Sequence, residues 1–338
     1  MDERERERRR RKRRSIQMMR RRRRRRKILL ISMSVLLFLF IAILSACFRM
    51  CGSDESENQD EISQDAGGDD EITPTPTESV PDTITLSTMD IYKGDLILVN
   101  NVYEYHFEDN ADEIQLTSLN EYKAGIIKAG KDDLKLAARI LEPLEKMISD
   151  CNTSLGVDNT GVTSAYRTRE YQQDVYNQYV EEGGVEYAEA YVSDPGYSEH
   201  HTGLSLDMGI YYHDGSEGRF SGSSNAEWMD ANCQEYGFVR RYQEDKTEIT
   251  GINNESWHFR YVGVPHATYM NANNLCLEEY IAYLRANTSK EVPLSVACST
   301  GTYQIYATKE TNMAKPEQEY TISGDNIDGY IITIKSNE

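Results

Sequence analysis

The stretch "SEHHTGLSLD", from Ser198 to Asp207, is the most informative part of this chain of 338 residues. Two adjacent histidines precede a glycine, and apolar residues then alternate with polar ones. The alternation predicts a β-strand over 203–210 that turns Asp207 to its polar face, with His200 in the loop that feeds the strand. An imidazole and a carboxylate can then approach one point, as in a metal site. By itself, however, the stretch favours an ordinary loop with a hydrogen-bonded or solvated histidine.

A second polar cluster, "NNESWHFRY" at 253–261, changes that balance. It places Glu255, Trp257 and His258 at the entry of a predicted strand. Catalytic zinc sites use three protein ligands and leave a fourth position to water, and a nearby carboxylate can move the proton of that water to a leaving group. Glu255 can be this carboxylate, although its own position alone favours a solvated surface acid. The candidate ligands are His200, Asp207 and His258.

A third motif, "SAYRTREYQQ" at 164–173, contributes a cation. Arg167 follows a short predicted strand, and its guanidinium is a fork of donors suited to an oxyanion or a carboxylate. Gln172 follows a little more than one helical turn later and can add a polar contact. An arginine that leads into an amphipathic helix is more often a surface charge, so this motif alone is weak.

Taken together and in this order, the three motifs resemble those of the VanY-type D-alanyl-D-alanine carboxypeptidases. The family pattern reads S-G-Y-R-S/T, S-x-H-x-x-G-x-A-x-D and E-x-W-H, and the resemblance spans roughly Tyr92 to Asn287. The departures are small: Ala165 replaces a glycine, Ser205 an alanine and Ser256 a proline. We expect the Ser205 hydroxyl to hydrogen-bond Asp207.

The resemblance implies one zinc ion per chain, held by His200, Asp207 and His258. It also implies that Glu255 is the catalytic acid and base and that Arg167 stabilises the polarised carbonyl. His201 matches no family role and is interpreted as a loop or rim residue. The residues expected to contact substrate are Ser198, Gln172, Tyr166 and Trp257.

The implied activity is removal of the terminal D-alanine from the stem pentapeptides of peptidoglycan, with a possible contribution to glycopeptide resistance. One alternative is an L,D-carboxypeptidase that trims tetrapeptides, since it resembles this chain in all three motifs. The alternative from another class is a non-catalytic wall-binding module. A complete ligand set together with Glu255 argues against that module, because a purely structural zinc site is closed and needs no base.

Charge is distributed unevenly along the chain. Residues 1–27 carry 17 of the 37 Lys and Arg residues but 4 of the 56 acidic ones, which leaves a net charge of −32 on the rest. The uncharged run that follows, 28–48, is 21 residues long, and about 20 apolar residues span a bilayer as a helix. We therefore expect a single-pass membrane anchor.

The basic flank should remain in the cytoplasm, which places the catalytic domain outside a bacterial cell. A basic run can also bind nucleic acid, but next to a membrane span it favours a topogenic or lipid-binding role, so no nucleic-acid partner is expected. "LSAC", Leu44 to Cys47, resembles a lipoprotein cleavage site. The long basic region and long apolar run favour an uncleaved anchor over a cleaved signal.

The sequence suggests five segments. The acidic, Ser-, Gly- and Pro-rich residues after the anchor cannot bury enough apolar surface to offset the entropy of ordering, so they are expected to be a disordered linker. The rest mixes strands and helices without regular alternation, which favours an α+β fold with a small antiparallel sheet and flanking helices, as in the lysostaphin/D-Ala-D-Ala/Sonic-hedgehog group that the chain resembles. The segments are 1–27 (basic tail), 28–48 (anchor), 49–85 (linker), 86–290 (zinc carboxypeptidase domain) and 291–338 (C-terminal β appendage).

Periodicity predicts the individual elements. A β-rich run at 91–105 is expected to start the ordered structure, and a hairpin is expected within 320–334. Four cysteines beyond the membrane edge could form disulfides or remain buried thiols, and the absence of a CxxC pair argues against a thiolate zinc site. The predicted helices are 132–150, 168–182, 225–236 and 275–287, and the predicted strands are 162–166, 203–210 and 257–263.

Overall fold

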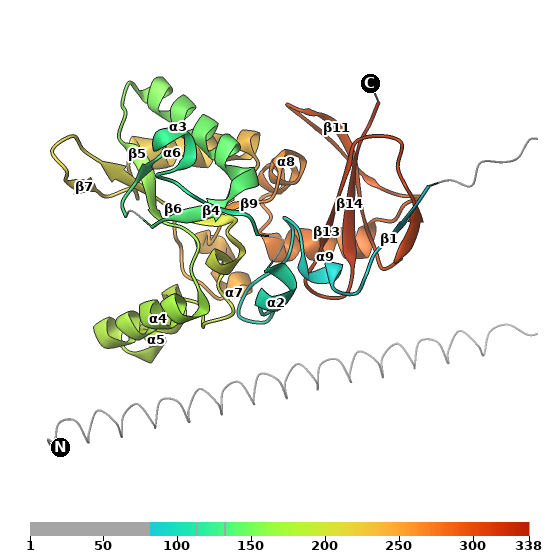
Figure 1. Cartoon of the computed structure of the whole chain (residues 1–338), viewed down its shortest axis with the longest axis horizontal. Coiled ribbons are helices and arrows are strands. Elements are labelled where there is room, and N and C mark those ends of the chain that lie inside the picture. The colour runs from blue at the N-terminus through green and yellow to red at the C-terminus, as the bar shows by residue number, and fades with distance from the viewer. Residues whose placement is uncertain (1–81, 112–113, 132, 338) are drawn as a thin grey trace, which may run out of the picture. The chain divides into compact units, whose positions relative to one another are not determined.

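The computed structural model describes residues 82–111, 114–131 and 133–337. Its central sheet has six strands in the order β3-β5-β6-β9-β8, with β7 paired to β6 (Figure 1). The β3–β5 pair is parallel and the others are antiparallel, so the expected antiparallel sheet is in fact mixed. The strands are β3 (Lys128–Ala129), β5 (Thr160–Ser164), β6 (Ser205–Tyr211), β7 (Glu217–Gly218), β8 (Phe238–Arg240) and β9 (His258–Tyr261).

The strand predicted from the opening motif is β6, at the middle of this sheet. Its first six residues are buried, as expected for a central strand covered on both faces. Asp207 pairs with Ser164 of β5 on one side and with His258 of β9 on the other. The register shift between Val162 and Ser164 sets the first of these pairings. All three motifs therefore meet at one end of β6.

Helices cover the sheet on both faces. In Figure 1, α3 and α6 lie on one side of the strands, and α4, α5 and α7 lie on the other. Thr168 caps α4 by accepting a hydrogen bond from the Tyr171 amide, and Gly237 ends the segment after α6 in the left-handed conformation expected for a helix C-terminus. The helices are α2 (Phe107–Asn110), α3 (Leu141–Leu155), α4 (Arg169–Gly183), α5 (Val185–Tyr191), α6 (Ser224–Asn232), α7 (Thr247–Thr250), α8 (Val264–Ala272) and α9 (Leu277–Asn287).

The C-terminal residues form a second, four-stranded antiparallel sheet in the order β10-β11-β14-β13. The hairpin predicted within 320–334 is confirmed as β13 and β14. Two short two-stranded pairs, β1–β12 and β2–β4, complete the strands. These elements are β1 (Thr83–Thr85), β2 (Leu116–Ser118), β4 (Lys135–Ala137), β10 (Leu294–Cys298), β11 (Gly301–Thr308), β12 (Asn312–Ala314), β13 (Tyr320–Gly324) and β14 (Tyr330–Lys335).

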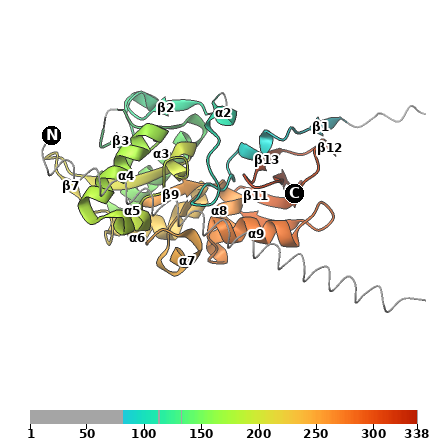
Figure 2. The same ribbon diagram turned by 90° about the horizontal axis from the view of Figure 1, so that it is seen from below.

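The C-terminal sheet does not have a core of its own. Ile305 and Ile331 pack in one apolar cluster with Met270 of α8, Tyr280 of α9 and Leu98, and α9 lies along the strands (Figure 2). The described residues accordingly form one compact unit. The strands of the predicted β appendage are therefore present, but they share an apolar core with α8 and α9, which lie before the predicted boundary at residue 291.

Two sequence predictions about local structure were wrong. Residues 96–100 are buried but form no strand in the described chain, because their backbone is bound by side chains and by isolated backbone contacts instead of a ladder. Ser323 Oγ accepts from the Leu96 amide, and Asn326 donates to the Leu98 carbonyl. The helix predicted from residue 132 begins as α3 only at Leu141, since 135–137 pair with β2.

The predicted tail, anchor and most of the linker, through residue 81, lie outside the described residues. Within the described ranges, no helix combines the length and apolar character that a bilayer span requires. The four cysteines that the structure describes are free thiols, so the disulfide alternative does not hold for them.

Candidate active site

The three predicted metal ligands converge. Asp207 on β6 and His258 on β9 are direct cross-strand partners, and His200 lies in the short 3-10 helix Glu199–Thr202 that feeds β6. One nitrogen from each histidine and one carboxylate oxygen of Asp207 all lie within 4.8 Å of one another. Residues far apart in sequence are thus gathered by the register of two neighbouring strands.

The spacing of these atoms suits a zinc ion. Zinc bonds of about 2.0–2.1 Å in tetrahedral geometry place neighbouring ligand atoms about 3.3 Å apart. Here His258 Nδ1 lies 3.0 Å from Asp207 Oδ1, and His200 Nε2 lies 3.5 Å from Asp207 Oδ2. Two imidazoles and one carboxylate form a ligand set typical of a catalytic zinc site, which leaves a coordination position open.

Each histidine is oriented by its other ring nitrogen. His200 Nδ1 lies 2.7 Å from the Ala165 carbonyl, which can only accept, so Nδ1 carries the proton and Nε2 is free to bind a metal. Burial lowers the pKa of His200 to about 4, which keeps the ring neutral. His258 Nε2 lies 3.2 Å from Glu199 Oε2, and its Nδ1 faces Asp207. On both rings, the nitrogen that faces away from the predicted metal position thus has a fixed partner.

The buried carboxylate of Glu199 was not recognised from the sequence. Arg241 Nε and Arg260 Nη1 lie 3.0 and 3.3 Å from its Oε1, while Ser205 Oγ donates to Oε2 over 3.3 Å. Burial opposes ionisation, but the two guanidiniums hold the pKa of Glu199 below its ordinary value. The expected bond from Ser205 to Asp207 is thus wrong, because the Ser205 hydroxyl binds the carboxylate that orients His258.

The Glu199 carboxylate is held in place by residues farther from the metal cluster. Arg241 also binds Glu278 of α9 through two nitrogens, at 2.8 and 3.0 Å, and Glu278 accepts from the Asn100 amide. In this hydrogen-bonded series, which runs from Asn100 through Glu278, Arg241 and Glu199 to His258, each buried charge has a partner, as burial of charges requires. The position of His258 is therefore supported by residues from several elements. The only available sequence signal for Glu199 was its place directly before His200.

Glu255, the predicted acid and base, lies beside the ligands. Its Oε2 is 4.0 Å from His258 Nδ1, and the residue is 8% exposed. Burial, joined by the negative charge of Asp207, raises the pKa of Glu255 to about 8. A carboxyl group whose pKa lies near neutrality can both accept and return a proton.

Arg167, the predicted cation, points into the same cluster. Its Nη2 lies 3.1 Å from Asp207 Oδ2 and 2.8 Å from Ser164 Oγ, and its Nη1 donates to Gln172 Oε1. The Gln172 amide nitrogen donates to the Ser193 carbonyl, so both ends of this buried side chain are engaged within the protein. Gln172 therefore lines the cavity and also holds Arg167 in place.

A cavity opens beside these groups. Of the residues expected to contact substrate, Ser198, Gln172 and Trp257 line it, together with Arg167 and Glu255. Tyr166 is half-buried and, among the described residues, is not part of the lining. Seven other lining residues were not predicted from the sequence: Val175, Tyr179, Tyr191, Val192, Ser193, Tyr242 and Ile252.

His201 is not the loop or rim residue that was expected. It is fully buried, its Nε2 accepts from the Gly196 amide over 3.0 Å, and its Nδ1 donates to the Arg167 carbonyl over 2.7 Å. Burial lowers the pKa of His201 to about 4. Because both nitrogens are engaged by backbone, His201 ties the Arg167 segment to the 3-10 helix and offers no atom to a metal.

Comparison with known proteins agrees with this geometry. A family model described as "VanY: D-alanyl-D-alanine carboxypeptidase" matches residues 133–264. A D-alanyl-D-alanine carboxypeptidase of Enterococcus faecium is 35% identical over 254 residues, which cover 74% of this chain and 78% of that protein. The chain belongs to the VanY family. The three predicted ligands, Glu255 and Arg167 all lie within the range that the family model matches.

Other VanY relatives match parts of the chain. A D-alanyl-D-alanine carboxypeptidase of Enterococcus faecalis is 43% identical over 129 residues, or 36% of this chain and 46% of that protein. The crystal structure of the vancomycin-resistance D,D-dipeptidase VanXYg, bound to a D-Ala-D-Ala phosphinate analogue, is 29% identical with a TM-score of 0.66. The match covers 76% of this chain and 100% of the VanXYg chain. The α+β fold is thus that of the VanY and VanX peptidases.

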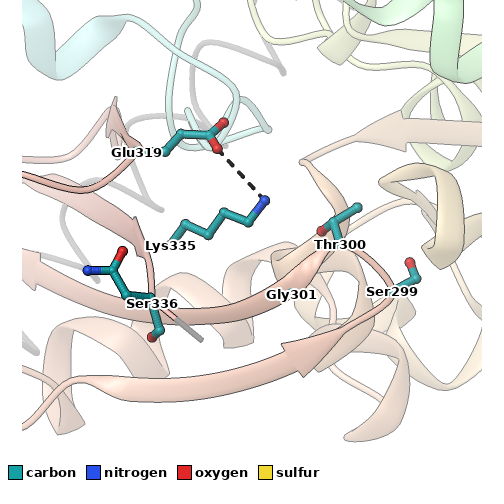
Figure 3. Close-up of a pocket in the computed structure, with 7 residues that line it drawn as sticks. Ser299, Thr300, Gly301, Glu319, Lys335 and Ser336 are labelled. Atoms are coloured by element: carbon teal, nitrogen blue, oxygen red, sulfur yellow. Dashed lines mark ion pairs between the residues drawn. The ribbon is translucent and has the colours of Figure 1, made fainter.

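A second hollow lies on the C-terminal sheet and contains different chemistry (Figure 3). Its charged groups are one cation and one anion, Lys335 and Glu319, which lie 3.8 Å apart and neutralise each other. The other lining residues are small or polar and include Thr300 and Ser336. The metal-ligating group found among the described residues, His200, Asp207 and His258, lies at the other cavity.

Proposed function

We propose that this protein is a zinc-dependent D,D-carboxypeptidase that removes the terminal D-alanine from the stem pentapeptides of peptidoglycan. The observation that carries the proposal is the convergence of His200, Asp207 and His258 with Glu255 on one cavity. The arrangement occurs in a chain whose VanY-family relatives are D-alanyl-D-alanine carboxypeptidases.

Glu255 is positioned for the proton transfers. When bound, zinc polarises the amide carbonyl and increases the acidity of water. Glu255 lies next to His258 and lines the cavity, so its carboxylate is placed to accept a proton from water. The same carboxyl group then returns that proton to the departing amine of D-alanine. One carboxyl group thus serves both proton transfers of the hydrolysis.

Arg167 supplies fixed positive charge. Ser164 and Gln172 hold its guanidinium in the cavity wall, so the charge needs no rearrangement when negative charge develops on the substrate carbonyl. The apolar and aromatic faces of Trp257 and Ile252 border the same space and limit the access of bulk water. We assign the oxyanion-stabilising role to Arg167.

We also propose that the catalytic domain is tethered to the outer face of a bacterial membrane by residues 28–48. Support comes from the 21 uncharged residues of this segment and from the basic residues that precede it. A protease added to intact cells should remove the domain while leaving the basic tail protected. Protection of the domain until the cells are lysed would contradict this topology.

The activity is tested with defined peptides and the zinc-loaded protein. The protein should release D-alanine from a pentapeptide stem, and a chelator should abolish the release until zinc is restored. Release from a tetrapeptide but not from a pentapeptide would favour the L,D-carboxypeptidase instead. Cleavage of free D-Ala-D-Ala alone would indicate a dipeptidase. Zinc binding without release of any amino acid would leave a wall-binding module.

A further inference from the structure

Three tyrosines form a connected aromatic cluster on the helical hairpin of α4 and α5. The rings of Tyr179 and Tyr187 stack with centroids 5.7 Å apart, and Tyr191 lies 5.0 Å from Tyr187 in a tilted arrangement. Gly183, at the end of α4, makes room for the middle ring, because a Cβ at this position would lie 2.4 Å from the Tyr187 ring. The cluster is therefore a packed feature of the hairpin.

The cluster is continuous with the catalytic cavity. Tyr179 and Tyr191 line the cavity that also contains Glu255 and His200. Tyr187 is 41% exposed and forms the outer part of the same cluster. Two rings thus belong to the wall near the reacting groups, and the third extends this wall to the surface.

The charge of the hairpin favours a cation. Residues 169–191 contain six carboxylates and a single basic residue, Arg169. The Arg169 guanidinium lies 2.8 Å from Glu104 and over the ring of Phe107, so its charge is already compensated. Aromatic faces attract ammonium groups through their quadrupole, and nearby carboxylates add to this attraction while repelling anions.

We propose that Tyr179, Tyr187 and Tyr191 form a subsite for the side-chain ammonium of the diamino acid that precedes the two D-alanines of the stem peptide. This inference rests on the proposed function. The residue in question lies one peptide unit before the alanine whose carbonyl reacts, or about 3.8 Å between Cα atoms. Tyr179 and Tyr191 line the cavity and Tyr187 is exposed, so a side chain that follows this wall brings its ammonium to the solvent boundary.

The subsite is tested with two acylated tripeptides that differ in one group, L-Lys-D-Ala-D-Ala and L-norleucine-D-Ala-D-Ala. For the zinc-loaded protein at pH 7 and low salt, kcat/KM should be about tenfold higher for the lysine peptide, the size of one partly desolvated cation–π contact. Tyr187→Leu should abolish this preference, whereas Tyr187→Phe should retain it because the ring remains. Tyr212→Leu, at a residue that is 49% exposed and follows β6, is the matched control and should retain it as well.

The possible outcomes separate the subsite from the activity. Zinc content verifies that each protein is folded and loaded, and the rate on the norleucine peptide measures any loss that does not depend on the ammonium. Equal rates for the two peptides, a preference that survives Tyr187→Leu, or an equal loss on both peptides would each overturn the subsite while leaving the carboxypeptidase in place. Failure to release D-alanine from either peptide would overturn the proposed function, and the subsite with it.

Discussion

Two clusters of the molecule each bury a histidine, and they differ in what surrounds the ring. His258, at the metal cluster, lies between the carboxylates of Asp207 and Glu199. His266 of α8 lies between the hydroxyls of Tyr280 and Thr333, at 2.8 and 3.1 Å. Burial acts on both rings to lower the pKa, but the two carboxylates raise that of His258 to about 9, whereas His266 falls to about 3.

The difference shows how one residue type can serve two purposes. Asp207 and Glu199 place negative charge on both sides of His258, so this cluster is stabilised by a cation. The hydroxyls around His266 satisfy a neutral ring and join α8, α9 and β14. Buried histidines facing carboxylates therefore indicate a functional site here, and a buried histidine facing hydroxyls indicates a structural contact.

The largest expected effect comes from the two adjacent histidines of the opening motif. His200→Ala removes a ligand and should abolish both stoichiometric zinc binding and release of D-alanine, since three protein ligands are the usual minimum for such a site. His201→Ala should retain zinc, because both its ring nitrogens bind backbone groups, although it should be less stable. Metal analysis of the purified variants checks both. Zinc retained by His200→Ala would break the assignment.

Glu255→Gln should follow in size. The amide preserves shape but cannot accept and return a proton, so kcat should fall by about 10²- to 10⁴-fold while zinc remains bound. Steady-state release of D-alanine from a pentapeptide measures the effect, and the metal content of the same sample is the control. A rate equal to that of the wild type would exclude Glu255 as the acid and base.

Glu199→Gln tests whether the carboxylate behind His258 matters to the metal. Loss of the charge that orients His258 should weaken zinc affinity or activity by about 10- to 100-fold. Ser205→Ala is the matched control, because it removes only the hydroxyl bond to the same oxygen and should have a smaller effect. Competition with a chromogenic chelator measures the affinity. If both variants bind zinc as tightly as the wild type, the orienting role is wrong.

The ligand set could be predicted because its chemistry is local in sequence. His200 and Asp207 flank the start of one strand, and His258 enters its partner, so two correctly predicted strands place all three together. Glu199 was missed since its role depends on Arg241 and Arg260, which the fold brings to it from 42 and 61 residues away.

The errors have a related cause. His201 and the segment 96–100 were interpreted from local pattern, but their environment comes from distant groups. The sequence of 96–100 alternates like a strand, yet several of its backbone hydrogen bonds go to Ser323, Asp325 and Asn326, more than 220 residues away. The C-terminal strands were predicted correctly, but the packing of α8 and α9 against them could not be read from periodicity.

The smallest effect concerns pH and the second histidine cluster. His266 stays neutral in the folded protein down to a pKa of about 3 but takes up a proton near 6.5 when unfolded. The unfolded state therefore binds more protons between these values, so stability falls as pH decreases below 6.5, by at most about 1.4 kcal/mol per pH unit from this residue. His266→Gln tests this, because glutamine cannot titrate. The variant should be less stable than the wild type at pH 7.5, but its free energy of unfolding should fall less than that of the wild type between pH 7.5 and 5.5. Urea unfolding of the zinc-loaded wild type and variant measures both values, and the contributions of the other histidines are the same in the two proteins. Parallel pH curves would show that His266 is not held neutral, and the contrast with His258 would then fail.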